Sequence, residues 1–281
     1  MKKIFTCIVL SFFLVACSDS EELDTKPTPI NSPIPIAYTE KTKTIQGDFS
    51  EKKALEFLYG NYDETQKESN WQLTKEDLEK VDEYSSLKDE KDLAVTALLL
   101  SPFQQEGIDK YLLITAAFAP ERACHACAPM IGSFIFKKND NTWDLEIEEK
   151  CLLELGSYGV PPDAKLIKIG KDNYATLFET SDTGQGRNYQ GITVFAKIDK
   201  AFSKILEIET GEDNSGDCGD NLAPCWSYSS KYEFVPGKNE SFFDFKITTT
   251  GTSGVEGEKT TAPVNENKLY QFDGKEYKVS K

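Results

Sequence analysis

The sequence predicts a mainly β protein: an antiparallel meander, propeller-like or sandwich in type, with one or two short N-terminal helices. Two observations predict this class. From Asp92 onward apolar and polar residues alternate with a period of two, the pattern of half-buried strands. Turn-forming residues separate these runs, and the short connections favour antiparallel pairing. Because 39% of the residues are hydrophobic, the chain can form a real core, and we expect a single domain over 47–281.

The first residues follow the pattern of a secretory signal peptide, in which a positively charged start precedes an apolar run. Two lysines precede an apolar run, Ile4 to Ala16, which is too short to span a bilayer comfortably. The run ends in Leu14-Val15-Ala16-Cys17, which resembles the lipobox of bacterial lipoprotein precursors. The resemblance implies a signal peptide over 1–16, cleavage before Cys17, and acyl chains on Cys17 that anchor the chain in a membrane. The alternative is an ordinary signal peptide, with Cys7 and Cys17 incidental.

The residues that follow the lipobox bear on where the anchored chain would reside. Ser18 and Asp19 favour the outer membrane, by resemblance to the enterobacterial sorting rule. Removal of residues 1–16 takes away two lysines and no acid, so the net charge of −15 becomes −17. Such an acidic chain is poorly suited to binding nucleic acid or to electrostatic docking onto anionic lipid. We therefore expect a lipid-anchored envelope protein, facing the periplasm or the surface, with no nucleic-acid partner.

Residues 17–46 have the composition of a linker. They are polar and contain Pro27, Pro29, Pro33 and Pro35, which favour extended backbone and remove amide donors. We expect a free tether between the lipidated cysteine and the domain. The alternative is an irregular edge that lies along the domain.

Two segments after the linker are predicted to be helical. In the first, Asp48 to Tyr62, Asp48 and Glu51 fit a capping box, and a helical stripe is formed by Ala54, Leu55, Leu58 and Tyr62. The second runs from Thr74 to about Val81 and begins with Thr74 and Asp77. Short helices of this kind commonly cover an edge or face of a sheet.

About a dozen strands are predicted after these helices. Leu93–Phe103 and Ile108–Ala119 form a hairpin around Gln104–Gly107, and three further runs alternate around Trp143-Leu145-Ile147, Ile192-Val194-Ala196-Ile198 and Phe243-Phe245-Ile247. Turn signals occur near residues 139, 171, 238 and 274. Their spacing hints at a repeated hairpin, as in a propeller-like or meandering sheet, although a sandwich with irregular strand lengths has the same signals.

Five cysteines remain once Cys7 and Cys17 are set aside, which is an odd number for an oxidising compartment. Cys218 and Cys225 flank a polar loop that has little else to hold it, so we expect a disulfide between them. Cys151 has no evident partner in the sequence.

The stretch Ala123–Pro129 contains the only histidine of the chain, His125, between Cys124 and Cys127. Four interpretations arise: a structural disulfide, a redox-active pair tuned by His125, a metal site that includes Cys151, and haem attachment. Haem is excluded because that motif places histidine after the second cysteine. No second C-x-x-C or C-x-x-H completes a tetrahedral metal set. We predict no metal and no cofactor.

The redox interpretation is weakened by the residues after the motif. In thioredoxin-like proteins a long helix begins within the motif, whereas residues 130–136 have a strand pattern. Cys-His-Ala-Cys-Ala-Pro, a strand, Trp143 and Gly156-Ser157-Tyr158-Gly159 together resemble a group of uncharacterised exported bacterial proteins and lipoproteins. The resemblance covers about Cys124 to Val194 and implies export, with no catalytic residues. We interpret the motif as a disulfide-closed corner between two strands.

Other catalytic and ligand motifs are incomplete. The acidic stretch Glu212–Asp220 does not fit an EF-hand loop: counted from Asp213, the places that need glycine and glutamate hold Cys218 and Pro224, so we expect a solvated turn. Gly184-Gln185-Gly186 lacks the lysine of a phosphate loop and is expected at a hairpin tip. A serine hydrolase would need G-x-S-x-G, which is absent from the sequence.

The leading functional hypothesis is a non-catalytic envelope lipoprotein that binds a protein, a glycan or a small ligand at loops of its sheet, or has a structural role. The alternative hypothesis is a periplasmic thiol–disulfide protein acting through Cys124 and Cys127, with His125 beside them.

Overall fold

The computed structural model describes residues 43–81, 85, 87–120, 124–219, 222–238, 240–255 and 259–280. The predicted signal peptide, Cys17 and most of the predicted linker lie outside the described residues. The described chain is mainly β, as predicted, and its strands form two antiparallel sheets. None of the helices in the described part is both long and apolar enough to span a membrane.

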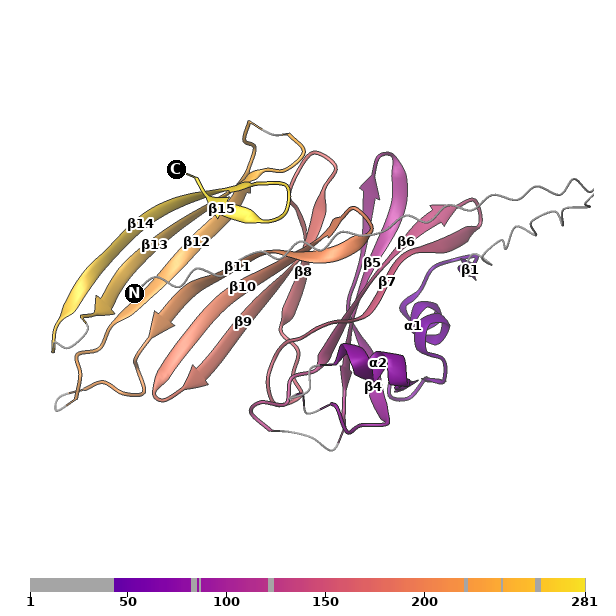
Figure 1. Ribbon diagram of the computed structural model, residues 1–281, viewed down its shortest axis with the longest axis horizontal. Helices are drawn as coiled ribbons and strands as arrows, with labels where there is room; N and C mark the ends of the chain where they lie inside the picture. Colours follow the sequence, from indigo (N-terminus) through magenta and orange to yellow (C-terminus); the bar gives the residue numbers. More distant parts are fainter. Residues whose placement is uncertain are drawn as a thin grey trace, which may run out of the picture. The chain divides into compact units, whose positions relative to one another are not determined.

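The first sheet contains seven strands, which appear from indigo to magenta in Figure 1. In sheet order they are β1 (Thr44–Gln46), β7 (Thr142–Glu154), β6 (Met130–Asn139), β5 (Ile108–Phe118), β4 (Asp92–Gln105), β3 (Glu68–Gln72) and β2 (Tyr62–Asp63). The predicted hairpin is present: β4 from Ala94 onward pairs with the whole of β5 around Glu106-Gly107, both of which have positive φ. Apart from β1, each strand pairs with its neighbour in sequence, which confirms a meander.

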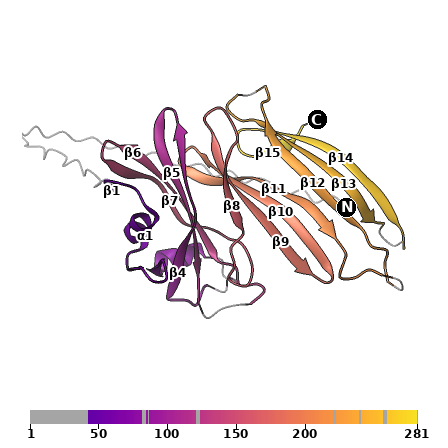
Figure 2. The same cartoon turned by 180° about the vertical axis from the view of Figure 1, so that it is seen from behind.

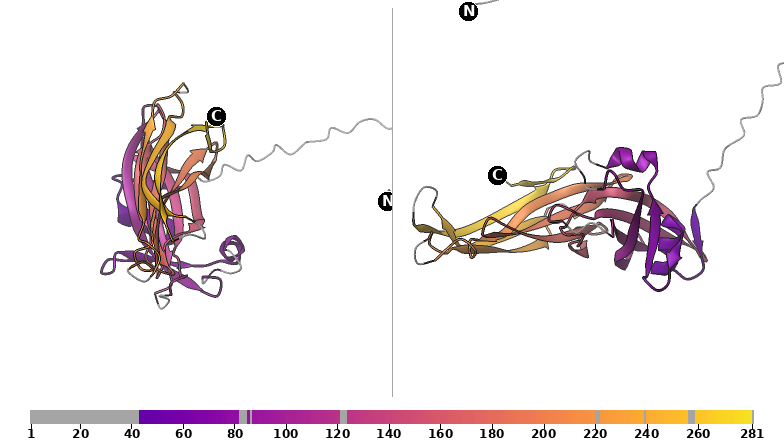
Figure 3. Two further views of the ribbon diagram at one scale, coloured as in Figure 1. Left: turned by 90° about the vertical axis from the view of Figure 1, so that its left-hand side faces the viewer. Right: turned by 90° about the horizontal axis from the view of Figure 1, so that it is seen from below.

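The second sheet contains eight strands and is also a meander. In sheet order they are β15 (Tyr277–Val279), β14 (Thr261–Phe272), β13 (Asp244–Gly254), β12 (Ser227–Val235), β11 (Ala201–Asp213), β10 (Arg187–Ile198), β9 (Tyr174–Gly184) and β8 (Asp163–Lys168). The pairing of β11 with β12 is limited to three residues, Gly211–Asp213 with Ser227–Ser229, whereas the other long strands pair over most of their length. Beyond this junction β12–β14 lie at the end of the second sheet remote from the first sheet (Figure 3).

Helices α1 (Glu51–Tyr59) and α2 (Lys75–Lys80) confirm the two predicted helices. The capping box of α2 is formed by Thr74 and Asp77, as expected. The cap of α1 differs from the prediction: Ser50, not Asp48, accepts a hydrogen bond from the Lys53 amide. Helix α1 is also shorter than predicted, because Gly60 takes positive φ at its C-terminus and the chain turns into β2.

The first sheet lies between α1 and the second sheet (Figures 1 and 2). Along β5 the side chains alternate between the two layers: Leu113 packs beneath α1, while Leu112 and Ile114 face the second sheet. There they meet Phe178 of β9 and Phe195 of β10. A separate core within the second sheet surrounds Ile192, Val194, Phe245 and Ile247.

A partly buried ion triad also joins the two sheets. Glu146 of β7 accepts hydrogen bonds at 2.7 Å from Lys110 of β5 and at 2.7 Å from Lys197 of β10. The Lys110 side chain is 7% exposed and also donates to Gln105 at 3.0 Å. Burial alone would raise the pKa of Glu146, but the hydrogen bonds from Lys110 and Lys197 outweigh it and lower this pKa.

Bulges change which face some predicted strand residues occupy. In β7, Trp143 and Leu145 pack towards α1 as one alternating face, but Ile147 packs with the opposite cluster. The cause is a register shift between Ile135 and Phe136, which leaves Glu146 unpaired in the ladder and turns Ile147 towards the second sheet.

Two further expectations are corrected. The predicted linker to Gln46 ends earlier, because Thr44–Gln46 form β1 and Ile45 is buried against the first sheet. The four predicted turns each join two consecutive strands of a meander, but the strands form sheets of seven and eight rather than four-stranded blades, so the propeller-like alternative is not the architecture of the described chain.

Candidate functional site

The C-x-x-C motif lies in the connection between β5 and β6, and its two sulfurs form a disulfide. The Cα atoms of Cys124 and Cys127 are 4.9 Å apart, and the Cys127 amide donates to the Cys124 carbonyl oxygen at 2.9 Å. Cys124 is exposed and Cys127 is 6% exposed. The motif is therefore a covalently closed corner between two strands.

This corner is docked on the turn between β7 and β8. The amides of Tyr158 and Gly159 donate to the carbonyl oxygens of Cys124 at 3.0 Å and Cys127 at 2.7 Å. The turn itself is closed by paired backbone bonds between Ser157 and Val160. Together the two loops form a fixed unit, which we call the roof, comprising residues 124–127 and 155–162.

The turn requires glycine at one position. Gly156 has a φ of +113°, and a Cβ there would be 2.1 Å from the Val160 carbonyl oxygen. Any other residue at position 156 would therefore displace this turn of the roof.

His125 connects the roof to the second sheet. Its Nε2 lies 3.0 Å from Oδ1 of Asp182 on β9, and its ring meets the ring of Tyr158 edge-on at 5.3 Å. Asp182 Oδ1 also accepts a hydrogen bond from the Thr183 amide at 2.8 Å. His125 is thus held against a carboxylate of the second sheet.

A groove of about 770 Å³ lies between the roof and the second sheet. Its floor comes from three adjacent strands: residues 179–182 of β9, 189–193 of β10 and 207–209 of β11. The roof contributes His125, Ala126, Ser157 and Val160 among its lining residues, and Asp163 at the start of β8 is a lining residue too.

Two features of β10 shape the floor. Gly191 has no side chain above the floor, and Thr193, two residues along on the same face, is 4% exposed and lines the groove. A bulge between Gln190 and Gly191 brings Glu209 opposite Gly191, on the same face.

The end of the floor at β11 is strongly acidic. The Tyr228 hydroxyl donates to Glu209 and, at 3.0 Å, to Glu212. Burial, and then the hydrogen bonds to these two carboxylates, raise the pKa of Tyr228. Arg187 pairs with Glu212 at 3.2 Å, which leaves Glu209 without a basic partner in the described part of the chain.

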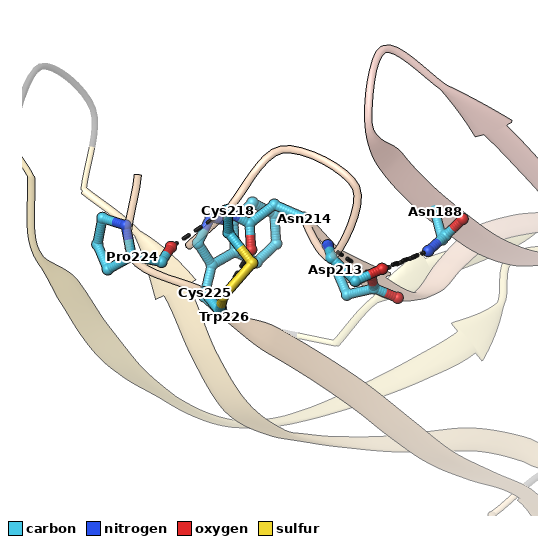
Figure 4. The surroundings of a disulfide bond; sticks show 8 residues. Asn188, Asp213, Asn214, Cys218, Pro224, Cys225 and Trp226 are labelled. Carbon is cyan, nitrogen blue, oxygen red and sulfur yellow. Dashed lines mark hydrogen bonds between the residues drawn. A yellow bond between two sulfur atoms is a disulfide. The ribbon is translucent and has the colours of Figure 1, made fainter. Parts of the chain in front are cut away.

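The second predicted cysteine pair also forms a disulfide. The bond between Cys218 and Cys225 closes a loop, and the Cα atoms of the two cysteines are 5.0 Å apart. Figure 4 shows the buried Asn214 directed at Pro224 and Trp226: its side-chain amide donates to the Pro224 carbonyl oxygen at 3.1 Å, and its Oδ1 accepts from the Trp226 amide at 2.8 Å. Asn214 therefore fixes both ends of the loop in addition to the disulfide.

In the acidic stretch before this loop, the Asp213 carboxylate forms hydrogen bonds with neighbouring residues. Asp213 accepts hydrogen bonds at 2.9 Å from the Ser215 amide and from Asn188 on β10. Figure 4 shows the second of these bonds. The hydrogen bonds from Ser215 and Asn188 lower the pKa of Asp213. Among the residues with assigned positions, no three His, Cys, Asp or Glu side chains are placed to hold a metal ion.

Cys151 lies apart from the groove lining. It is a half-buried free thiol on β7 that packs beside the cluster of Leu55 and Trp71 on the helix side of the first sheet. Burial, and then the negative charge of Asp77, raise its pKa to about 11. The metal interpretation that included Cys151 with Cys124 and Cys127 is wrong in this structure, because the latter two sulfurs bond to each other.

Sequence reasoning found the roof but missed the floor. Thr193, Glu207 and Glu209 belong to ordinary alternating strands, and nothing in their local pattern distinguishes them from other half-buried positions. The predicted hairpin tip at Gly184–Gly186 is present, with positive φ at Gln185 and Gly186. Comparisons of the chain with protein-family models, with curated proteins and with solved structures gave no match.

Proposed function

We propose that this chain is a lipid-anchored protein of the bacterial envelope whose β domain is a binding module, with the groove between roof and floor as its binding site. The observation that carries the proposal is the construction of this groove. Its roof is fixed by a disulfide, by two loop-to-loop backbone hydrogen bonds and by the contact of His125 with Asp182. A wall that is already ordered binds a ligand without further loss of conformational freedom.

The groove has the dimensions and chemistry of a recognition site. Its volume is within the range of small-molecule and peptide pockets. The floor presents hydroxyl and carboxylate groups, while Val160 on the roof is 63% exposed. A partly polar, partly apolar groove suits selective binding of a ligand that has both kinds of surface.

Nuclear magnetic resonance mapping tests the binding proposal. A panel of a basic peptide, an acidic peptide, a polyamine and a neutral oligosaccharide is titrated into the purified chain. We expect one class to cause saturable shifts concentrated on the amides of Gly191, Thr193 and Ser157. Shifts that cluster at the Cys218–Cys225 loop, or none from any class, would contradict the groove as the site.

The anchor is tested separately by Cys17→Ser. If Cys17 carries the acyl chains, this variant is released from membranes, whereas Cys7→Ser remains anchored because Cys7 would leave with the signal peptide. Continued membrane attachment of Cys17→Ser would contradict lipidation.

A second candidate function is thiol–disulfide exchange, favoured by the unequal exposure of the pair. Cys124 is exposed while Cys127 is buried, so a thiolate from a partner dithiol would attack Cys124 Sγ. The Cys127 thiolate would leave, and attack by the partner's second thiol would then release reduced Cys124; two electrons and two protons would pass to this chain. Alkylation trapping in thiol–disulfide buffers distinguishes the functions: the binding module keeps the pair oxidised throughout, whereas an exchange protein cycles near the potential of periplasmic oxidoreductases.

A further inference from the structure

A narrow slot lies between the two sheets, where the tip of the β4–β5 hairpin meets the β8–β9 turn. Gln105 of β4 donates a hydrogen bond to the Asp172 carbonyl oxygen of that turn at 2.8 Å, and Gln105 lines the slot. The walls are mainly apolar and come from both sheets: Phe103, Leu112 and Ile135 on one side, and Leu166, Phe195 and Phe202 on the other. The slot and the groove share no lining residue.

One hydroxyl in this slot lacks a partner. Thr176 of β9 is paired with Phe195 of β10, so its side chain lies on the same face of the second sheet as Phe195, towards the first sheet. Thr176 is 2% exposed and lines the slot, and its Oγ1 is buried without a hydrogen bond to any described residue. Buried hydroxyls are ordinarily hydrogen-bonded, because desolvation without a partner costs free energy. A hydrogen-bonding guest in the slot would satisfy the Thr176 hydroxyl.

The volume and the charge of the slot restrict this guest. The slot has a volume of about 20 Å³, compared with about 770 Å³ for the groove. A cavity needs about 10–15 Å³ to hold one water, so the slot admits a single water and is too small for a metabolite or an acyl chain. A small cation is disfavoured, because Lys197 also lines the slot.

Polar side chains that line the slot can supply the other hydrogen bonds of a water. The Lys197 ammonium has three N–H donors and gives one of them to Glu146 at 2.7 Å. Asn173 also lines the slot; its Nδ2 donates to the Ser241 carbonyl oxygen at 2.6 Å, and its Oδ1 is an acceptor. Since a buried water typically makes about three hydrogen bonds, these two side chains and Thr176 provide enough groups.

We propose that the slot is a binding site for one ordered water, held by the Thr176 hydroxyl with Lys197 and Asn173 as its further partners. The water completes the hydrogen bonding of an otherwise apolar layer and is part of the packing between the two sheets. This proposal does not rest on the proposed binding function, because the slot and the groove have separate linings.

A crystal structure of the purified chain, at a resolution that shows ordered solvent, tests the site directly. We expect one isolated density peak in the slot, about 2.5–3.0 Å from Thr176 Oγ1. The peak should be weaker or absent in Thr176→Val, which is nearly isosteric but lacks the hydroxyl. An empty slot in the wild-type chain, or a Thr176 hydroxyl that is bonded to another protein group, would overturn the proposal.

Urea unfolding tests the role of the hydroxyl in solution. If a water is bound, Thr176→Val removes one of its hydrogen bonds, and the equilibrium constant for unfolding should rise about fivefold. If the slot is dry, the same change removes an unpartnered hydroxyl, and the constant should stay the same or fall. An unchanged or lower constant would therefore overturn the assigned role of Thr176.

Two control variants calibrate this measurement. Thr115→Val removes a hydroxyl that lies 3.0 Å from the Tyr59 hydroxyl, so it should raise the unfolding constant as a lost hydrogen bond does. Ser133→Ala removes a buried hydroxyl that has no partner in the described chain and does not line the slot, so it should not raise the constant. A response of Thr176→Val like that of Thr115→Val supports the proposal, whereas a response like that of Ser133→Ala contradicts it.

Discussion

The ion triad of Glu146, Lys110 and Lys197 allows a sharp test of how the two sheets are held together. In Glu146→Gln the shape is kept, but two ammonium groups lose their shared negative partner. Removing one partner of a fully buried pair costs about 3–5 kcal/mol. Here Lys110 is 7% exposed but Lys197 is 27% exposed, and the amide oxygen still accepts one hydrogen bond. We therefore expect a loss of about 2–3 kcal/mol in the free energy of unfolding.

Urea unfolding followed by tryptophan fluorescence measures this loss. The matched control is Glu148→Gln, because Glu148 lies two residues along the same strand and its close partner, at 2.8 Å, is Lys43, whose side chain is 65% exposed; its other partner, Lys150, is farther away at 3.8 Å. The control should cost at most about 0.5 kcal/mol. Equal losses in the two variants would refute the argument that burial makes the triad matter.

The pH dependence gives a second, independent check. Since the folded-state pKa of Glu146 lies below its ordinary value, the stability that it contributes is present above about pH 4.3 and is lost as pH falls through the lowered pKa. The difference between the wild-type chain and Glu146→Gln should shrink in acid. A difference that stays constant down to about pH 2 would show that the variant acts through packing rather than charge.

Three further predictions concern single features. Gly156→Ala should lower stability by about 1–3 kcal/mol, since its Cβ would meet the Val160 carbonyl oxygen; thermal unfolding at the wild-type midpoint would contradict this. Cys218→Ser with Cys225→Ser should cost about 2 kcal/mol through the gain in entropy of the unfolded loop, and urea midpoints that match the wild type would show that the remaining contacts suffice. Burial raises the pKa of Cys151 to about 11, so its contribution to stability, full below about pH 8.5, should fall as pH rises to 11; Cys151→Ala should show a flatter decline over that window, and an identical decline would contradict the shift.

Local patterns predicted the features that depend on neighbours in sequence. The β4–β5 hairpin follows from alternation on both sides of Glu106-Gly107, and the cap of α2 from the spacing of Thr74 and Asp77. The Cys218–Cys225 bond was likewise predictable, because a short polar loop brings its own ends together. In each case the residues that decide the structure lie within a few positions of one another.

Features that depend on distant partners were not predictable in this way. The sequence alternates through Trp143 and Ile147 without a break, yet a bulge turns Ile147 to the other layer, where Glu146 meets Lys110 and Lys197. The groove floor likewise depends on which strands are adjacent. Only the assembled sheet brings Asp182 to His125, which is 57 residues away in sequence.

The short junction between β11 and β12 has a consequence for how the molecule fluctuates. Only three residue pairs join these strands. The other links of β12–β15 to the rest of the sheet are the side chains around Phe245 and Val194 and two backbone hydrogen bonds, from the Lys171 amide to the Glu240 carbonyl oxygen and from the Phe243 amide to the Ile169 carbonyl oxygen. Segments with few shared backbone bonds open cooperatively at a free energy below that of global unfolding. Amide hydrogen exchange should therefore divide the second sheet at this junction, with β9 and β10 protected longest and β12–β14 exchanging together as one earlier unit.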